Sequence, residues 1–584
     1  MNQNFLVENT PKTNNRRYKI PGMSNLEKIT SNLSLTERFI FLLLLSATAL
    51  GAFMILWNIQ SSFLVTVPAY DGVLKEGIVG TPGPINPLLA STASDRALVS
   101  LIYSGLMKAT LDGYLINDLS KSHQISEDGT EYVFKLRKGS TFHDGTPVTA
   151  RDVVFTVEKA KDPVIRSSIA GNWSNIKVEA VDRYTIKFTL PEPRAGFLEM
   201  ATLGIMPRHL WEPVDSNRFA FSSLNTDPVG TGPYKISSIS FKDGNPDKYE
   251  LRSFEKYVGG KPYIKKLIFP FFHDEREAWN ALQKKEIDAL AGFSPKRMES
   301  MVRADVDVRT SPLPRVFAVF LNQNKNEALA DINVRKALSK AVDREKVLLE
   351  TINGKGSLIY GPISPMVINK QEQITNIDTD EEDVETPDSL LKKAGWEYDE
   401  ELGGLTKDGE TVLSIEISTV ANSDLQKAAE VIERQWNKLG INTTIALYGS
   451  NELNQNVLRP REFEGLLFGY ILDRDFDLFP FWHSSERNDP GMNLSLYTNI
   501  SVDKLLEEYR ENKDPSKRKE ILKNIEEAIR QDVPAIFLYS PHFLYATPQD
   551  IRDLDVGYMT SPEERFLDIH KWFIETDRVW SFLL

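Results

Sequence analysis

The sequence predicts an α/β fold, because strand and helix patterns alternate along the chain. Residues 132–137 alternate apolar and polar side chains as a half-buried strand does, and residues 149–161 then place apolar side chains at helical spacing. A second unit runs from an amphipathic helix at 426–439 into a strand at Ile441. Near the end of the chain, the helix pattern at 515–531 is followed by an apolar strand. These units indicate a mixed, strand-rich body covered by helices.

A turn joins the strand and the helix of the first unit. Gly145 suits a positive φ, Asp144 can bond its own backbone, and Pro147 ends the strand. Thr149 is a suitable N-cap, and Asp152, three residues later, can complete a capping box. A strand-to-helix corner needs these residue types in any case, so the motif indicates a structural role.

Composition excludes several classes of function. The chain has 584 residues with 41% hydrophobic residues, enough for a large two-lobed body with a smaller subdomain. It has no cysteine, which removes thiol nucleophiles, disulfides, cysteine metal sites and a lipid-attachment cysteine. The net charge of −13 argues against nucleic acid as a partner. The seven histidines are scattered singly, so neither a metal nor another cofactor is expected.

The N-terminal segment predicts a membrane anchor. Residues 1–38 are polar and basic and are expected to form a disordered cytoplasmic tail. Residues 39–57 carry no charge, and as a helix they span roughly 28 Å, about the thickness of the bilayer core. The basic flank orients this helix with its N-terminus inside and the folded body outside the cytoplasm. We therefore expect a single-pass anchor at 39–58 in the cell membrane, followed by a tether at 59–75.

A cleaved signal peptide is the alternative interpretation of this segment. The triplet Ala47-Thr48-Ala49 has small residues at the spacing of a cleavage site. It lies in the middle of the apolar span, however, with the apolar residues 53–56 still to follow. This position favours the uncleaved anchor.

Several short sequence words, in a fixed order, resemble one protein family. They are Phe142-His143-Asp144-Gly145-Thr146-Pro147-Val148-Thr149-Ala150, Asp152-Val153-Val154-Phe155, Pro228-Val229-Gly230-Thr231-Gly232-Pro233-Tyr234, Asn333-Val334-Arg335-Lys336-Ala337-Leu338 and Ala341-Val342-Asp343-Arg344. Together they resemble the peptide/nickel class (family 5) of extracellular solute-binding proteins, the substrate receptors of ABC importers. The resemblance covers the chain from Glu76 onward.

The resemblance implies a two-lobed periplasmic-binding-protein-like α/β fold with an extra subdomain. The predicted first lobe comprises residues 76–112, 226–318 and 544–584, the extra subdomain 113–225, and the second lobe 319–543. The implied function is capture of an oligopeptide or similar small solute in a hinged cleft, by a monomer, and its delivery to ABC permease subunits. No enzymatic activity is implied.

The candidate binding residues follow an apolar segment at 465–472, which is typical of a buried strand. Strand ends at a lobe interface commonly line clefts. In peptide-binding relatives an aspartate at the place of Asp473 pairs with the ligand's α-ammonium group, and a preceding aromatic residue lines the same pocket. The resemblance thus implies Asp473 as the ammonium anchor and Tyr470 as a pocket wall, with Trp482 and His483 completing the predicted substrate-binding set.

Other interpretations of this segment and of the chain stay open. The acids after the strand could form a solvated surface loop, and Arg474 could neutralise Asp473. At the level of function, a membrane-anchored sensor or adhesin could keep the same fold without a transporter. A surface hydrolase is the third possibility, although the chain has no Gly-x-Ser-x-Gly motif.

Overall fold

The computed structural model describes residues 33–62, 64–194, 196–363, 385–407, 409–421, 423–512 and 514–580. The chain forms two units. One contains residues 1–68 together with 576–584, and the other, here called the body, contains residues 69–575.

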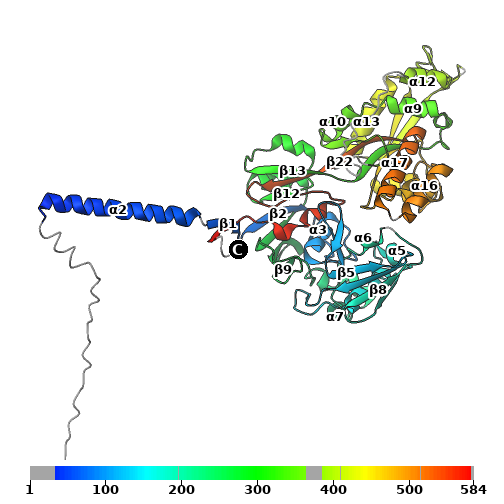
Figure 1. The fold of residues 1–584 in the computed structure, drawn as a ribbon. Helices are drawn as coiled ribbons and strands as arrows, with labels where there is room; N and C mark the ends of the chain where they lie inside the picture. The colour runs from blue at the N-terminus through cyan, green and yellow to red at the C-terminus, as the bar shows by residue number, and fades with distance from the viewer. Residues whose placement is uncertain are drawn as a thin grey trace, which may run out of the picture. The chain divides into compact units, whose positions relative to one another are not determined.

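A 12-stranded mixed sheet runs through the body (Figure 1). Its strands follow the order β20-β19-β21-β14-β22-β12-β2-β11-β10-β9, and β13 and β15 also pair with β22. The strand bounds are β2 (Val73–Val79), β9 (Tyr234–Lys242), β10 (Asn245–Ser253), β11 (Lys266–Phe272), β12 (Ala289–Ala291), β13 (Val306–Pro312), β14 (Arg315–Leu321), β15 (Gly356–Leu358), β19 (Ser414–Val420), β20 (Asn442–Tyr448), β21 (Gly465–Ile471) and β22 (Ala535–Pro548).

The hydrophobic cores divide the body into two lobes. Core residues of the first lobe come from 74–313 and 543–572, and those of the second lobe from 316–539. The helices of the first lobe include α3 (Ala93–Ile102) and α8 (Glu275–Gln283). Those of the second lobe include α9 (Ile332–Lys340), α10 (Arg344–Ile352), α12 (Pro387–Lys393), α13 (Asp424–Asn437), α16 (Ile500–Glu511) and α17 (Pro515–Asp532).

Two chain crossings connect the lobes. One is the short link between β13 and β14, and the other is the middle of the long strand β22. The Ser540 hydroxyl donates to the Leu313 carbonyl oxygen at 2.6 Å, so the two crossings are bonded to each other. These two crossings are where a hinge between the lobes would have to bend. The predicted lobe boundaries at 318 and 543 lie close to these crossings and stay predictions.

A four-stranded antiparallel sheet lies beside the first lobe and shares its core. Its order is β5-β6-β8-β7, with β5 (Ser120–Ile125), β6 (Glu131–Leu136), β7 (Lys177–Ala180) and β8 (Thr185–Thr189). The associated helices are α4 (Ala150–Lys161), α5 (Ala170–Trp173), α6 (Phe197–Met200) and α7 (Arg208–Trp211). The strand expected at 132–137 and the helix expected after Thr149 are confirmed. The Asp152 carboxylate accepts the Thr149 N–H at 2.8 Å, as the capping box predicts.

Two of the segments that resemble the family, residues 142–150 and 228–234, contact each other. Gly230 N–H donates to His143 Nδ1 at 3.3 Å, while His143 Nε2 lies 3.1 Å from the Gly232 carbonyl oxygen. Burial lowers the pKa of His143 to about 4, so the ring is neutral and Nε2–H donates to that carbonyl. A Cβ on Gly230 would lie 2.0 Å from the Ile102 carbonyl oxygen, so only glycine fits against the end of α3. His143 therefore fixes a corner of the fold.

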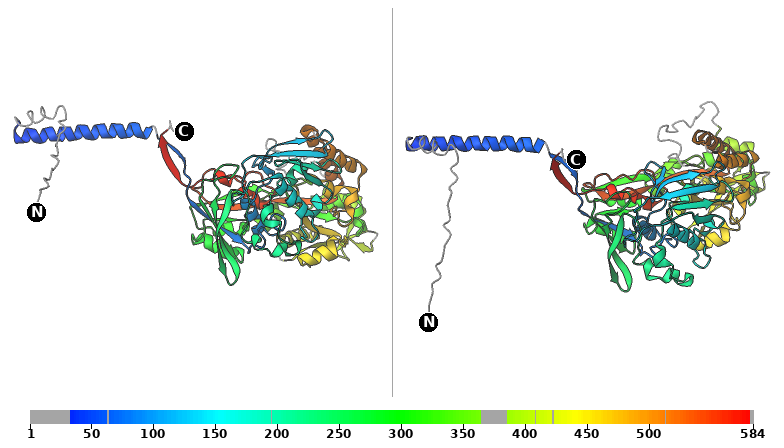
Figure 2. Two further views of the ribbon diagram at one scale, coloured as in Figure 1. Left: turned by 90° about the horizontal axis from the view of Figure 1, so that it is seen from below. Right: turned by 60° about the horizontal axis from the view of Figure 1, so that its bottom comes forward.

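The other unit differs from the tether predicted at 59–75. Helix α2 (Leu35–Ser62) continues beyond the predicted span, and its segment Leu35–Ile55 is long and apolar enough to cross a membrane. Strand β1 (Leu64–Pro68) follows and pairs with β23 (Thr576–Trp580), as Figure 2 shows. Because residues 576–580 pair with β1, they do not join the first lobe as the 544–584 boundary expected. Their valines and threonines favour a strand.

Candidate functional site

A cavity of about 1170 Å³ lies between the four-stranded subdomain and the second lobe. On the subdomain side its walls are residues around α5, the loop at 190–194 and the region of α6. On the other side they are residues 473–480, which follow β21, and the C-terminal end of α16. Eight acidic side chains but only two arginines, Arg194 and Arg510, line it. The excess of negative charge favours a cationic ligand group.

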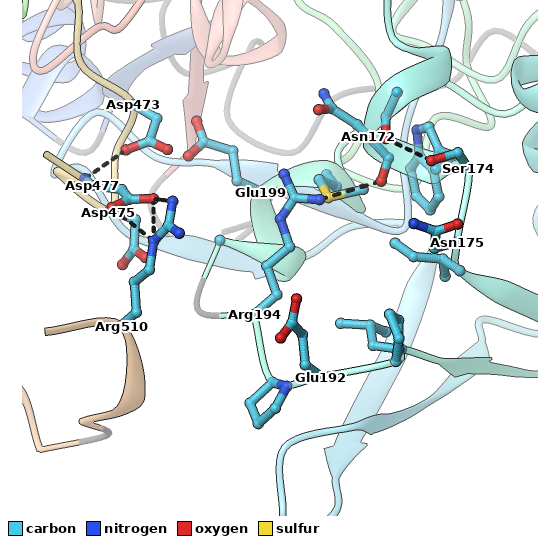
Figure 3. Close-up of a pocket in the computed structure, with 18 of the residues that line it drawn as sticks. Asn172, Ser174, Asn175, Glu192, Arg194, Glu199, Asp473, Asp475, Asp477 and Arg510 are labelled. Atoms are coloured by element: carbon cyan, nitrogen blue, oxygen red, sulfur yellow. Dashed lines mark hydrogen bonds and ion pairs between the residues drawn. The ribbon is translucent and has the colours of Figure 1, made fainter. Parts of the chain in front are cut away.

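Asp473 lies at this cavity without a cationic partner among the described residues. It follows the end of β21, as predicted, and its carboxylate faces the open space (Figure 3). Its Oδ1 accepts the backbone N–H of Asp477 at 3.3 Å. The side chain is in contact with solvent in the cavity, but the protein around this recess desolvates it and raises its pKa to about 6. A positive charge brought beside Asp473 would favour the ionised carboxylate.

Glu199 of α6 is the second acid at this position. Figure 3 shows the side chains of Glu199 and Asp473 pointing toward each other from opposite walls. Desolvation, together with repulsion from Asp473, raises the pKa of Glu199 to about 7. Its Oε2 accepts the backbone N–H of Arg474 at 3.2 Å. Two neighbouring carboxylates with raised pKa values are costly to ionise together unless a cation joins them.

Arg474 does not neutralise Asp473. Its buried guanidinium forms an ion pair with Glu564 of the first lobe and lies 3.8 Å from Glu199 Oε1. It also lies over the ring of Tyr558, 5.4 Å from the ring centroid. The side chain therefore reaches from the second lobe to groups on the facing side, and its charge is directed away from Asp473.

The next two aspartates have arginine partners of their own. Asp475 pairs with Arg518 at 2.7 Å, and Asp477 pairs with Arg510 at 2.6 Å. Arg510 belongs to helix α16 and Arg518 to helix α17, so these pairs hold the loop after β21 against these two helices. Asp475 and Asp477 thus each have an arginine partner, and Asp473 has none among the described residues.

The other predicted site residues lie behind the cavity wall. Tyr470 is buried, stacks on Phe481 and donates its hydroxyl to the Pro362 carbonyl oxygen at 2.6 Å. Trp482 is fully buried, and its Nε1–H donates to the Tyr470 hydroxyl at 3.4 Å. His483 stacks on Phe479, which itself lines the cavity. Of the four predicted residues only Asp473 lines the cavity, and a binding role for all four stays a prediction.

Glu199 and Arg510 were not identified from the sequence. Glu199 belongs to a helix of four residues that has no strong periodicity, and it lies 275 residues from Arg474 along the chain. Arg510 is one of many basic residues on amphipathic helices. No local signal distinguishes either residue. Among the described residues there is no group of histidine and carboxylate side chains that could hold a metal ion.

The fold and the cavity define a two-lobed receptor for a small ligand, and comparison with known proteins identifies its family. The family model of bacterial extracellular solute-binding proteins, family 5 Middle, matches residues 115–501, and the chain belongs to this family. It is therefore an extracytoplasmic binding component of ABC importers of the peptide/nickel class, and it binds its substrate without converting it. The predicted family, fold class and absence of enzymatic function are confirmed.

Individual relatives agree with this assignment. The oligopeptide-binding protein AppA of Bacillus subtilis is 27% identical over 520 residues, which cover 87% of this chain and 92% of that protein. The structure of AppA in complex with a nonapeptide superimposes with a TM-score of 0.65 at 25% identity, covering 87% of this chain and all of that one. NikZ of Campylobacter jejuni, in complex with Ni(L-His), has a TM-score of 0.65 at 26% identity, covering 86% and 99% of the two chains.

Proposed function

We propose that this protein captures peptides, or solutes with a similar cationic end, and delivers them to an ABC permease. The observation that carries the proposal is Asp473, which has no cationic partner among the described residues and faces Glu199 across a cavity of about 1170 Å³. The ligand's α-ammonium group would lie between the two carboxylates. AppA and its nonapeptide support a peptide as the ligand, and NikZ with its nickel–histidine complex provides the alternative to be tested.

Ligand capture would proceed by closure of the two lobes. Asp473 belongs to the second lobe and Glu199 to the subdomain that shares the first lobe's core, so one ammonium group would contact both sides. A ligand that binds the closed form better than the open form shifts the population toward closure. The crossings at β13–β14 and in β22 would absorb the change in backbone angles. The permease would then recognise the closed receptor.

Helix α2 would hold the receptor at the outer face of the membrane. Its apolar segment Leu35–Ile55 has the length and composition of a membrane span, and the residues before it are basic. The strand that follows the helix begins at Leu64. N-terminal sequencing of the mature protein tests this part of the proposal, because a start just after Ala49 would show that the helix is a removed signal sequence.

The ligand class can be tested with the full-length protein in detergent. Native mass spectrometry should show retained peptides, and titration calorimetry should show tighter binding of a free peptide than of the same peptide with an acetylated N-terminus. The nickel–histidine complex serves as the competing ligand. Equal binding of the free and acetylated peptides would contradict an ammonium site, and binding of the nickel complex alone would move the ligand class away from peptides.

A further inference from the structure

The ribbon of β1 and β23 brings a distant part of the chain back to the end of the apolar helix. β1 starts at Leu64, two residues after α2 ends at Ser62. The antiparallel register pairs Leu64 with Trp580 and Pro68 with Thr576. Strand β23 therefore runs toward α2, and its residue Trp580, which pairs with Leu64, is at the α2 end of the ribbon. Figure 2 shows the ribbon beside the end of the helix.

The ribbon is a sheet of two strands, with no third strand among the described residues. A two-stranded ribbon is only marginally stable in water. On the body side the ladder continues, because the Ala69 N–H donates to the Glu575 carbonyl oxygen at 2.9 Å. At its other end the ribbon adjoins helix α2.

The amino acids at the helix side are suited to a membrane interface. The chain has no charged residue between Arg38 and Asp71, so all of β1 is uncharged. Val65 in this strand is 42% exposed. On the other strand, Trp580 is the residue paired with Leu64. Tryptophan is enriched at the headgroup level of membranes, where its ring is amphipathic.

The length of α2 would place this end of the ribbon at the level of the outer lipid headgroups. A helix of 28 residues is about 42 Å long, close to the roughly 40–45 Å of a bilayer with its headgroups. If α2 crosses the bilayer, its C-terminal end lies in the outer headgroup region. Leu64 and Trp580 then lie in or directly above that region.

We propose that Trp580, at the end of β23, makes a second membrane contact, with the lipid headgroup region of the outer leaflet as the partner. The inference rests on the proposed role of α2 as an uncleaved anchor. The body is then attached to the bilayer through both strands of a ribbon, and its attachment includes residues from both ends of the described chain. The ribbon pairs five residues on each strand, so this attachment is two-stranded rather than a single irregular tether.

The absence of native cysteines makes the contact directly measurable. Full-length variants with a single cysteine, Arg578→Cys, Thr576→Cys or Gly51→Cys, are labelled with a fluorophore and reconstituted in phosphatidylcholine vesicles. These vesicles contain lipid with a nitroxide on the headgroup or on the acyl chain. Arg578 and Trp580 lie on the same face of β23, and Thr576 lies at the far end of the strand. Gly51 lies in the apolar span, where an added Cβ meets nothing within 4 Å.

We expect the headgroup nitroxide to quench the label at position 578 more strongly than the label at 576. In the background of Arg578→Cys, the substitution Trp580→Ser should abolish this excess quenching, while Trp580→Phe should retain most of it. Equal quenching at 578 and 576, or no change with Trp580→Ser, would overturn the proposal. The label at position 51 reports on the anchor separately, since absence of quenching there by the acyl-chain nitroxide would show that α2 is not inserted.

Discussion

Two sites in the body contain recessed acidic side chains, and they differ in whether the protein supplies a cation. In the core of the first lobe, Glu76 accepts two hydrogen bonds from Arg565, at 2.9 and 2.6 Å, and one from the Tyr545 hydroxyl at 2.6 Å. At the cavity, Asp473 accepts from the backbone but has no cationic partner among the described residues, and Glu199 lies opposite. A buried carboxylate with a built-in cation maintains the fold, because removing the arginine leaves the negative charge uncompensated. A carboxylate without a cation is suited to bind one from outside.

The largest effect is expected at the first of these sites. Arg565→Met should leave the fully buried Glu76 carboxylate without its cation and lower the free energy of unfolding by about 3–5 kcal/mol. Chemical denaturation of the body measures this loss. The double variant Glu76→Gln/Arg565→Met removes both charges and should recover part of the stability. A loss below about 1 kcal/mol in the single variant would mean that the pair is not structural.

The second-largest effect is expected on ligand affinity. Asp473→Asn should weaken binding of a free peptide by about 30-fold, which corresponds to roughly 2 kcal/mol for a charge pair in a partly closed cleft. The unfolding free energy should not fall, because Asp473 has no cationic partner in the part of the chain that the structure describes. Calorimetric titration measures the affinity.

Asp475→Asn is the matched control for this prediction, since it changes an acid two residues away that already pairs with Arg518. It should leave the affinity for the peptide nearly unchanged. N-terminal acetylation of the peptide should remove most of the difference between Asp473→Asn and the parent. Equal loss of affinity in both variants would instead indicate that the whole loop, rather than Asp473, recognises the ligand.

Local patterns in the sequence predict several elements of this structure. The strand at β6, the helix α4 and the strand at β21 follow from local periodicity and turn residues, which is why they were predicted within a few residues. The family words add the lobe arrangement that local patterns cannot supply. The end of the apolar strand predicted where the acidic run lies, and the family resemblance singled out Asp473 within it.

The remaining part of the candidate site depends on contacts distant in sequence. Tyr470 was expected to line the pocket, but the two-residue period places it with Leu472 on the buried face of the strand. Glu199 reaches Asp473 only through packing of the subdomain against the second lobe, and no spacing in the sequence reports that packing. Residues 59–75, which include β1, were predicted as a tether after the apolar helix. The partner strand β23 lies near the other end of the chain, so no local pattern predicts the ribbon.

A smaller loss of affinity is expected from the second acid of the cavity. Glu199→Gln should weaken peptide binding by about fivefold, or roughly 1 kcal/mol, because Arg474 already lies near this carboxylate and offsets part of its charge. The double variant Asp473→Asn/Glu199→Gln tests whether the two acids bind one cation. If they do, the combined loss should differ from the sum of the single losses, whereas strict additivity would indicate two independent contacts.

The smallest effect is expected on the pH dependence of stability without ligand. The folded-state pKa values of Asp473, about 6, and Glu199, about 7, lie above the ordinary values of these acids. Between about pH 4 and 7 the folded protein therefore binds more protons at these sites than the unfolded chain, and stability falls as pH rises through this window. Asp473→Asn should reduce that fall. The difference in melting temperature between this variant and the parent should stay within about 2–4 °C, the shift that 1 kcal/mol produces in a large domain.

A bound cationic peptide should reverse this pH trend, because it favours the ionised carboxylates. The affinity for the peptide should therefore rise from pH 5 to pH 8. Thermal melts of parent and variant across this range, with and without peptide, measure both trends, and a peptide affinity independent of pH would separate these two acids from ligand binding.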